Sequence, residues 1–205
     1  MGLTFVSYTL SSAEVPGRWS LVLFLPWCNF RCRHCHNWEI VVGKERASIR
    51  EGDVLWEISS NPVIDAVVIS GGEPTIYNPR RLKAFVERIK KGRPDIKVRV
   101  DTNGYSPSVV KELREVVDGF AIDIKAPISN PKLYAYTAGL SDVDTRRIIE
   151  SVRYADGMPL TIYRTPKYPW LSEKDIKEVR RFVGPLSSPW SLNEFVEVPS
   201  CPFGS

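Results

Sequence analysis

The feature that most constrains the fold is a repeated alternation between short apolar runs and longer stretches with helical periodicity. The apolar runs have the length and the bounding turn residues of buried strands. They lie at Ser20–Leu25, Val63–Ile69, Ile96–Val100, Phe120–Ile124, Leu160–Tyr163 and Glu194–Val198. Helical stretches separate these runs along the chain, which predicts a parallel α/β domain with right-handed crossovers.

Five helices are predicted between these six strands from capping residues and apolar spacing. Ser48 and Glu51 have the spacing of a capping box, and Ser172 with Asp175 marks the start of the last helix. The other helices are expected over 79–91, 106–117 and 142–155. Ahead of the first buried strand, Phe5–Tyr8 is predicted as a short edge strand.

The length of 205 residues favours one domain, with a leading segment over 1–18, a core over 19–198 and a tail over 199–205. A complete eight-stranded barrel needs roughly 250 residues, so an open doubly wound sheet and a partial barrel both fit. Polar residues recur directly after successive strands, at Cys28, Glu73, Asp101, Asp123, Lys125 and Arg164. Because the carboxyl ends of parallel strands carry the active site, this recurrence favours a six-stranded, TIM-like partial barrel that is open on one side.

Composition argues against several classes of function. The 28 basic and 24 acidic residues give a net charge of +4, and the basic pairs are spread over predicted helices, which disfavours nucleic-acid binding. No apolar run is long enough to span a bilayer, and the start lacks a signal-peptide pattern. Clustered thiols indicate a reducing compartment, so a cytoplasmic protein is expected. The lack of glutamine and the two methionines lean towards a thermophile.

The loop Cys28–Asn37 holds three of the four cysteines and both histidines. Thiolates spaced four and three residues apart can converge on one metal centre. One interpretation is an iron–sulfur cluster held by three thiolates, with one iron left open. The other is structural zinc, with His34, His36 or Cys201 as the fourth ligand. Zinc ribbons usually have two separated cysteine pairs, and this chain has none, which favours the cluster.

The same loop, together with motifs at later strand ends, resembles a known superfamily. The motifs are FLPWCNFRC at 24–32, Cys35-His36-Asn37, ISGGEPT at 69–75, DTNG at 101–104 and DIKAP at 123–127. Together they resemble the radical S-adenosylmethionine (SAM) superfamily, and within it the glycyl-radical-enzyme activating proteins. The activases of anaerobic ribonucleotide reductase and pyruvate formate-lyase are the most similar group. The resemblance extends from Val15 to Phe195, nearly the whole chain.

The resemblance implies a cofactor set and an activity. Cys28, Cys32 and Cys35 would hold a [4Fe–4S] cluster whose fourth iron binds the amino and carboxylate groups of SAM. Reductive cleavage of SAM would give methionine and a 5′-deoxyadenosyl radical, which abstracts hydrogen from a glycine of a partner glycyl radical enzyme. This oxidoreductase chemistry implies an anaerobic setting and an electron donor of the flavodoxin or ferredoxin type.

Further residues receive roles at the cofactor. Gly71 and Gly72 allow the backbone to approach the methionine amino group, and Glu73 accepts hydrogen bonds from that group or holds the turn. Asp123 and Lys125 face the same side of a strand end and bind the cofactor's ammonium and carboxylate, or form a rim ion pair.

Three more residues are assigned from the resemblance and from position. Thr102, beside Asp101, is expected near the cofactor, and in some resembling enzymes this pair helps to bind a monovalent cation. Arg164 is either a ligand of the cofactor's carboxylate or ribose, or a surface arginine.

The sequence departs from the family pattern at two places. The family often has glycine before the first cysteine and tyrosine or phenylalanine before the third, where this chain has Trp27 and His34. His34 could lie against the adenine, and Trp27 could fill core space behind the loop. His36 is expected to support the loop, and Cys201 to be a plain thiol. Two other functions stay open: a radical SAM enzyme acting on a small molecule or nucleoside, similar to deazaguanine synthases, and a non-catalytic zinc-binding module.

Overall fold

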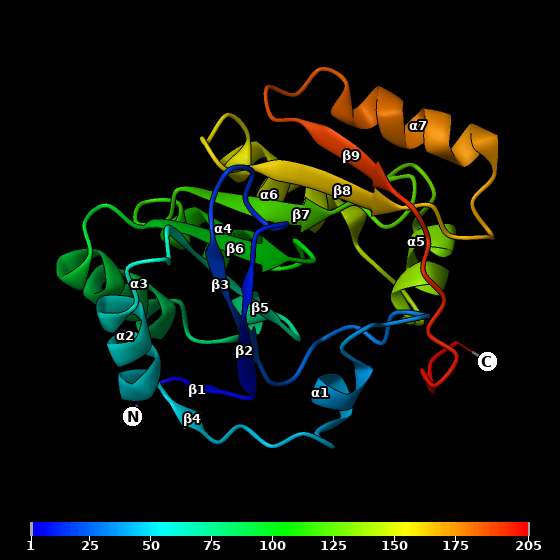
Figure 1. Cartoon of the computed structure of the whole chain (residues 1–205). Helices are drawn as coiled ribbons and strands as arrows, with labels where there is room; N and C mark the ends of the chain where they lie inside the picture. Colours follow the sequence, from blue (N-terminus) through cyan, green and yellow to red (C-terminus); the bar gives the residue numbers. More distant parts are fainter. Residues whose placement is uncertain (1, 205) are drawn as a thin grey trace.

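A seven-stranded sheet with two free edges forms the centre of the chain (Figure 1). The computed structural model describes residues 2–204, so Met1 and Ser205 of the predicted domain lie outside the described residues. In spatial order the strands are β2 (Ser7–Ser11), β3 (Ser20–Leu25), β5 (Ala66–Gly71), β6 (Lys97–Thr102), β7 (Gly119–Asp123), β8 (Ile162–Pro166) and β9 (Trp190–Asn193). Neighbours from β3 to β9 are parallel, and β2 joins β3 antiparallel. The predicted partial parallel barrel, open on one side, is therefore confirmed.

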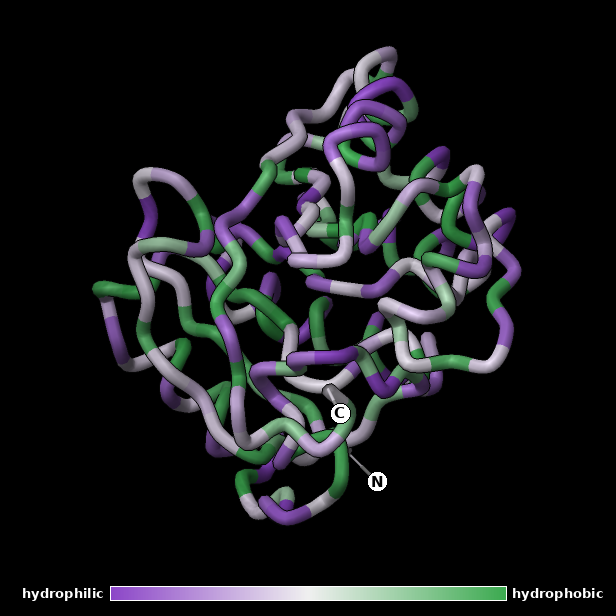
Figure 2. The backbone as a smooth tube through the Cα atoms, turned by 90° about the vertical axis from the view of Figure 1, so that its right-hand side faces the viewer, coloured by the Kyte–Doolittle hydropathy of each residue, from purple (hydrophilic) through white to green (hydrophobic). Residues whose placement is uncertain are grey.

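Helices occupy the connections between the parallel strands, as the alternation predicted. They are α1 (Trp38–Val42), α2 (Glu51–Ser60), α3 (Pro79–Gly92), α4 (Pro107–Leu113), α5 (Pro131–Ala138), α6 (Thr145–Ala155) and α7 (Glu173–Val183), with a 3-10 turn at Pro74–Ile76. A small separate sheet pairs β1 (Thr4–Phe5) with β4 (Ile49–Arg50). Most residues of helix α7 are hydrophilic (Figure 2). Its buried residues are Ile176, Val179 and Val183, so the helix packs on the domain through one apolar face.

The two faces of the sheet differ in chemistry, and β6 shows the difference within one strand. Val98 and Val100 are buried in the main apolar core. The alternate residues Arg99 and Asp101 are also buried but point to the opposite face, because successive side chains of a strand alternate. The face that carries Arg99 and Asp101 therefore buries charge beside a small second apolar cluster of Val15, Val22, Ala66 and Val68.

Several predicted boundaries are wrong, two of them for clear physical reasons. The last strand is β9 rather than Glu194–Val198, because Trp190 to Asn193 pair in parallel register with β8. The capping box at Ser48 is also wrong, since helix α2 begins after Arg50, whose backbone N–H donates to Asp53 at 3.1 Å. Glu51 instead accepts a hydrogen bond from the backbone N–H of Leu3 at 2.7 Å.

Helix α5 was not predicted, although its ends carry recognisable signals. The Asn130 side chain accepts from the backbone N–H of Leu133 at 3.1 Å, Pro131 is the first helical residue, and Gly139 closes the helix with φ of 64°. The helix predicted over 106–117 ends at Leu113, and the one over 142–155 begins at Thr145 after the cap Asp144.

Asp118 joins three elements of the domain just before β7. Its carboxylate accepts from the backbone N–H of Val98 at 2.8 Å and pairs with Lys90 of α3 at 2.8 Å and Lys97 of β6 at 3.2 Å. Burial alone would raise the pKa of Asp118, but hydrogen bonds from Lys90, Val98 and Lys97 hold that pKa below its ordinary value.

The lowered pKa of Asp118 predicts an acid-dependent loss of stability. The contribution is complete above the ordinary carboxyl pKa of about 4 and is lost as pH falls through the lower folded-state pKa. Urea unfolding at neutral pH should show that Asp118→Asn costs roughly 1–3 kcal/mol, with a smaller difference from the parent at strongly acidic pH. The exposed Glu115, which pairs with the surface Lys83, is the control, and Glu115→Gln should leave stability unchanged. Equal effects of both substitutions at all pH values would contradict this assignment.

Candidate active site

The carboxyl ends of the parallel strands surround a cavity of about 230 Å³. Its wall contains the thiols of the cysteine loop and the polar residues that follow the later strands. These are Cys28, Cys32, His34, Cys35, Gly71, Gly72, Glu73, Asp101, Thr102, Asp123, Lys125 and Arg164. The structure thus brings every predicted site residue to one cavity.

The cysteine loop is anchored on the C-terminal end of α5. The backbone N–H of Arg31 donates to the carbonyl of Ala138 at 3.0 Å, and that of Arg33 donates to Thr137 at 3.3 Å. A Cβ on Gly139 would lie 1.8 Å from the carbonyl oxygen of Arg31, so only glycine permits this approach. The unpredicted helix therefore sets the position of the loop.

The three loop thiols are protonated in the absence of a metal. Burial raises the pKa of Cys28 to about 12 and that of Cys35 to about 11, and burial also raises the pKa of Cys32. A metal centre would displace these protons on binding.

The three thiols fit a cluster better than a single metal ion. Within residues 2–204, no three His, Cys, Asp or Glu side chains converge closely enough to hold one metal ion. Tetrahedral zinc would need sulfurs about 3.8 Å apart. Thiolates of an iron–sulfur cluster each bind a different iron, and three thiols around one cavity fit that requirement.

The Gly-Gly-Glu turn is in direct contact with the segment that enters the cysteine loop. The backbone N–H of Glu73 donates to the carbonyl of Trp27 at 2.8 Å. A Cβ on Gly72 would lie 1.8 Å from that same carbonyl oxygen, and one on Gly71 would lie 2.3 Å from the backbone nitrogen of Leu25. These glycines are thus required by the packing of two strand ends, in addition to any approach to a cofactor.

Glu73 is buried and holds this rim together. Its carboxylate accepts from the backbone N–H of Thr75 at 2.9 Å and of Asn103 at 2.7 Å, and from the hydroxyls of Thr75 and Thr102, both at 2.6 Å. Burial raises the pKa of Glu73 despite these four donors. Of the two predicted roles for Glu73, holding the turn is the one that the geometry supports.

Asp123 and Lys125 form the predicted same-side pair. The Lys125 Nζ lies 3.1 Å from the Asp123 Oδ2, and Arg164 Nε donates to Asp123 Oδ1 at 3.2 Å. Burial opposes charge on both members, yet Lys125 and Arg164 hold the pKa of Asp123 below its ordinary value, and Asp123 raises the pKa of Lys125. The wall therefore carries a fixed ammonium and a fixed carboxylate, the complement of an amino-acid zwitterion.

Arg164 also binds Asp101, with Nη1 to Oδ2 at 2.9 Å, so of its two predicted readings that of an ordinary surface arginine does not hold. The second partner of Asp101 was not predicted. Arg99 donates from Nε to Oδ1 at 2.8 Å and from Nη2 to Oδ2 at 3.2 Å. Both oxygens of Asp101 thus accept from guanidinium groups, and the predicted monovalent cation near Asp101 is not supported. The signal was the i, i+2 spacing of Arg99 and Asp101 on one strand face.

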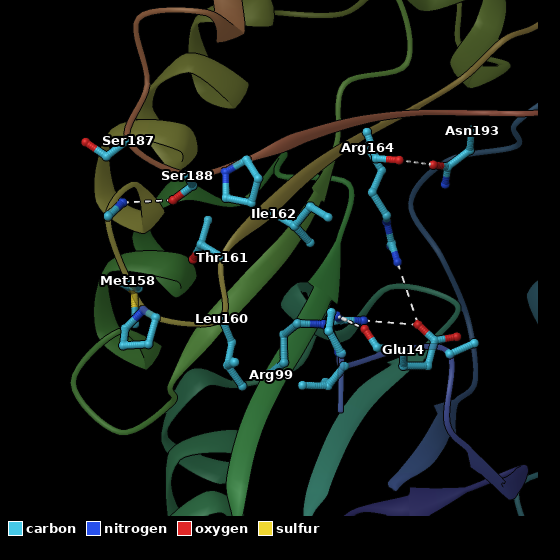
Figure 3. A pocket seen from close by; sticks show the side chains of 17 residues that line it. Glu14, Arg99, Met158, Leu160, Thr161, Ile162, Arg164, Ser187, Ser188 and Asn193 are labelled. Carbon is cyan, nitrogen blue, oxygen red and sulfur yellow. Dashed lines mark hydrogen bonds and ion pairs between the residues drawn. The ribbon is translucent and has the colours of Figure 1, made fainter. Parts of the chain in front are cut away.

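A second, larger cavity of about 650 Å³ lies on the other side of this charged row (Figure 3). Among residues 2–204, Arg164 alone lines both cavities. Glu14, from the loop between β2 and β3, reaches into this cavity and accepts from Arg99 Nη2 at 3.0 Å. Apolar walls are contributed by Met158, Leu160 and Ile162. We refer to this space as the base cavity.

The C-terminal segment 194–204 lies against the cysteine loop and contacts the side chain of His34 (Figure 1). The His34 ring stacks on Trp170, with centroids 5.8 Å apart, and meets Phe195 edge-on at 5.1 Å. The backbone N–H of Val198 donates to His34 Nδ1 at 3.5 Å. Cys201 is buried beside the loop, with Sγ 4.0 Å from the Cys32 carbonyl oxygen. The imidazole thus has aromatic partners within the chain.

Trp27 does not fill core space, which corrects the prediction. Its side chain is 55% exposed and lies over Gly43, and its φ is 66°. Positive φ costs a non-glycine residue roughly 1–2 kcal/mol, which explains why glycine is common at this position in the resembling family. The exposed His36 lines the cavity rim, in keeping with a supporting role.

Comparison with protein families gives a match over residues 22–183 to the family described as Radical SAM superfamily. A protein of Methanocaldococcus jannaschii named as a glycyl-radical enzyme activating enzyme is 36% identical over 118 residues, covering 57% of this chain and 47% of the relative. The chain therefore spans about half the length of that relative.

Two solved structures share the fold. Coproporphyrinogen III oxidase (HemN) from Escherichia coli, described as a radical SAM enzyme, superposes with a TM-score of 0.62 at 14% identity, covering 94% of this chain and 48% of that chain. The enzyme anSMEcpe with bound AdoMet gives 0.62 at 15% identity, covering 83% of this chain and 49% of that chain. No helix among the described residues is long and apolar enough to cross a membrane.

The contact between Gly72 and Trp27 predicts that Gly72→Ala disrupts the rim. The added Cβ requires a backbone shift, and urea unfolding should show a loss of about 2 kcal/mol or more. Gly52 of α2 is the matched control, because a Cβ there meets nothing within 4 Å. Gly52→Ala should be neutral or stabilising by up to about 1 kcal/mol. A Gly72→Ala variant as stable as Gly52→Ala would refute the contact.

Proposed function

The chain belongs to the radical SAM superfamily of enzymes, and from this premise we propose that it is an activase of a glycyl radical enzyme. It would cleave SAM reductively at a [4Fe–4S] cluster and abstract hydrogen from a glycine of the partner protein. The observation that carries the proposal is the convergence of three loop thiols and the Asp123–Lys125 pair on one cavity.

One group of residues would hold the cluster, and a second group would bind SAM. Cys28, Cys32 and Cys35 would hold the cluster, which when bound supplies the electron that cleaves SAM to methionine and a 5′-deoxyadenosyl radical. The Lys125 ammonium would bind the cofactor's carboxylate, and the Asp123 carboxylate would bind its ammonium. Glu73 fixes the Gly-Gly turn against the cysteine loop through its four donors.

The open side of the barrel suits a bulky substrate. The two edge strands, β2 and β9, do not pair with each other, and the base cavity lies near the segments that adjoin them. The partner's glycine segment would enter through the gap between these edge strands and meet the cofactor at the carboxyl ends of the parallel strands, where the thiol-lined cavity lies.

The similarity to the relative from Methanocaldococcus jannaschii supports a glycyl radical enzyme as the partner, because that relative is named as an enzyme that activates glycyl radical enzymes. A flavodoxin or ferredoxin-type protein would supply the electron, and the reaction would take place in the cytoplasm of an anaerobe. Superfamily membership argues against the zinc-binding module.

Cluster ligation is tested by comparing two cysteine variants. After anaerobic reconstitution the parent should hold about four irons per chain, Cys32→Ala should lose the cluster, and Cys201→Ala should retain it. Cys201 is the control because it is a buried thiol that lies outside the loop. Equal iron content in Cys32→Ala and the parent, measured with the visible absorption of the cluster, would refute the ligand assignment.

The protein substrate is tested with a glycyl radical enzyme encoded in the same genome. The reduced, reconstituted chain with SAM should generate the doublet of a glycyl radical in that protein, observed by electron paramagnetic resonance. A variant with the target glycine replaced by alanine should give no doublet. Formation of 5′-deoxyadenosine without any protein radical would exclude the activase and leave an enzyme acting on a small molecule or nucleoside.

A further inference from the structure

Arg99 is a buried cation on the inner face of the barrel that the proposed reaction does not use directly. Its side chain is only 4% exposed, and it binds Asp101 through two parallel hydrogen bonds. On its other side it donates to the backbone carbonyl of Glu14 and to the Glu14 carboxylate. Four of its donor contacts are therefore fixed by the fold, which makes Arg99 an immobile positive charge.

The positive charge of Arg99 stabilises the buried carboxylate of Asp101. The carboxylate is 7% exposed and lies between Arg99 and Arg164 on the wall of the thiol-lined cavity. A carboxylate buried to this extent needs a compensating charge, because desolvation otherwise costs several kcal/mol. Here two guanidinium groups occupy the acceptor positions.

The charges along the inner face are balanced. The cations are Arg99, Arg164 and Lys125, and the anions are Glu14, Asp101 and Asp123, so three positive charges meet three negative ones. Every neighbour in the row from Glu14 to Lys125 is joined by an ion pair. An additional cation at Asp101 would find both carboxylate oxygens bonded and would sit beside two guanidinium groups of the same sign.

We propose that Arg99 is a positioning residue that serves as a built-in cation for Asp101 and makes cofactor binding independent of monovalent cations. It fixes Asp101, Asp101 fixes Arg164, and Arg164 fixes Asp123, which faces the cofactor together with Lys125. The inference rests on the proposed function only for the identity of the cofactor.

The parent protein provides the first test, which needs no variant. SAM affinity of the reconstituted protein is measured by calorimetry in potassium chloride and in choline chloride at equal ionic strength. The two dissociation constants should agree within about twofold, since a difference of that size is a small fraction of a full charge interaction. An affinity at least tenfold higher in potassium would overturn the proposal.

Substitutions of Arg99 provide the second test. Arg99→Met should weaken SAM binding in choline by on the order of 10- to 100-fold, the usual effect of removing a partner of a ligand-binding group. Potassium should restore part of the loss, because it can take the position that the guanidinium leaves. Arg99→Lys keeps the charge but loses the paired hydrogen bonds to Asp101, so it should retain more of the affinity than Arg99→Met. Arg146→Met, which removes an exposed arginine paired with Asp144, is the control and should change nothing.

A purely structural role for Arg99 would give a different pattern. Arg99→Met would then lower the melting temperature, and potassium would restore neither the melting temperature nor the SAM affinity, a result that would overturn the proposal. Thallium(I) binding to the cluster-free parent, measured by equilibrium dialysis, is independent of the proposed function. Thallium bound stoichiometrically and lost in Asp101→Asn would also overturn the inference, whereas failure of the parent to bind SAM in any salt would count against the proposed function instead.

Discussion

The site depends on the way in which the barrel buries charge on its inner face. A charged side chain removed from water is tolerated only when opposite charges and hydrogen bonds surround it. The chain meets this constraint with one continuous row, in which Glu14, Arg99, Asp101, Arg164, Asp123 and Lys125 are each paired with a neighbour. Because each member fixes the next, the position of Lys125 beside the thiols depends on residues at the opposite end of the barrel.

The apolar face of the same sheet allows this arrangement. Side chains such as Val98, Val100 and Phe120 pack under the helices and stabilise the domain without the help of the interior. The inner face is then free to carry charge, and the carboxyl ends of the strands can bring ligands together. The cysteine loop gains its position from both sides, through the Gly-Gly turn of β5 and through the C-terminal end of α5.

Local signals allowed five of the six parallel strands to be predicted from sequence, and also the gathering of the rim residues and loop cysteines at one cavity, since apolar runs and the polar residues after them are contiguous in the chain. Features that depend on distant contacts were missed. The spacing of Arg99 and Asp101 on one strand face indicates their pairing, but no local pattern shows that Glu14 reaches Arg99 across the barrel. The tail from Glu194 onward has the composition of a strand, yet Trp190–Asn193 takes the edge position beside β8 and leaves that segment to cover His34.

We propose that the loop thiols and the Asp123–Lys125 pair form one site that binds and cleaves SAM. The most direct test of this proposal is anaerobic incubation of the reconstituted chain with dithionite and SAM, followed by chromatographic detection of 5′-deoxyadenosine and methionine. We predict that the parent forms both products in equal amounts, and that Lys125→Met forms far less at limiting SAM. A cluster-loaded, reduced protein that forms neither product would contradict the account.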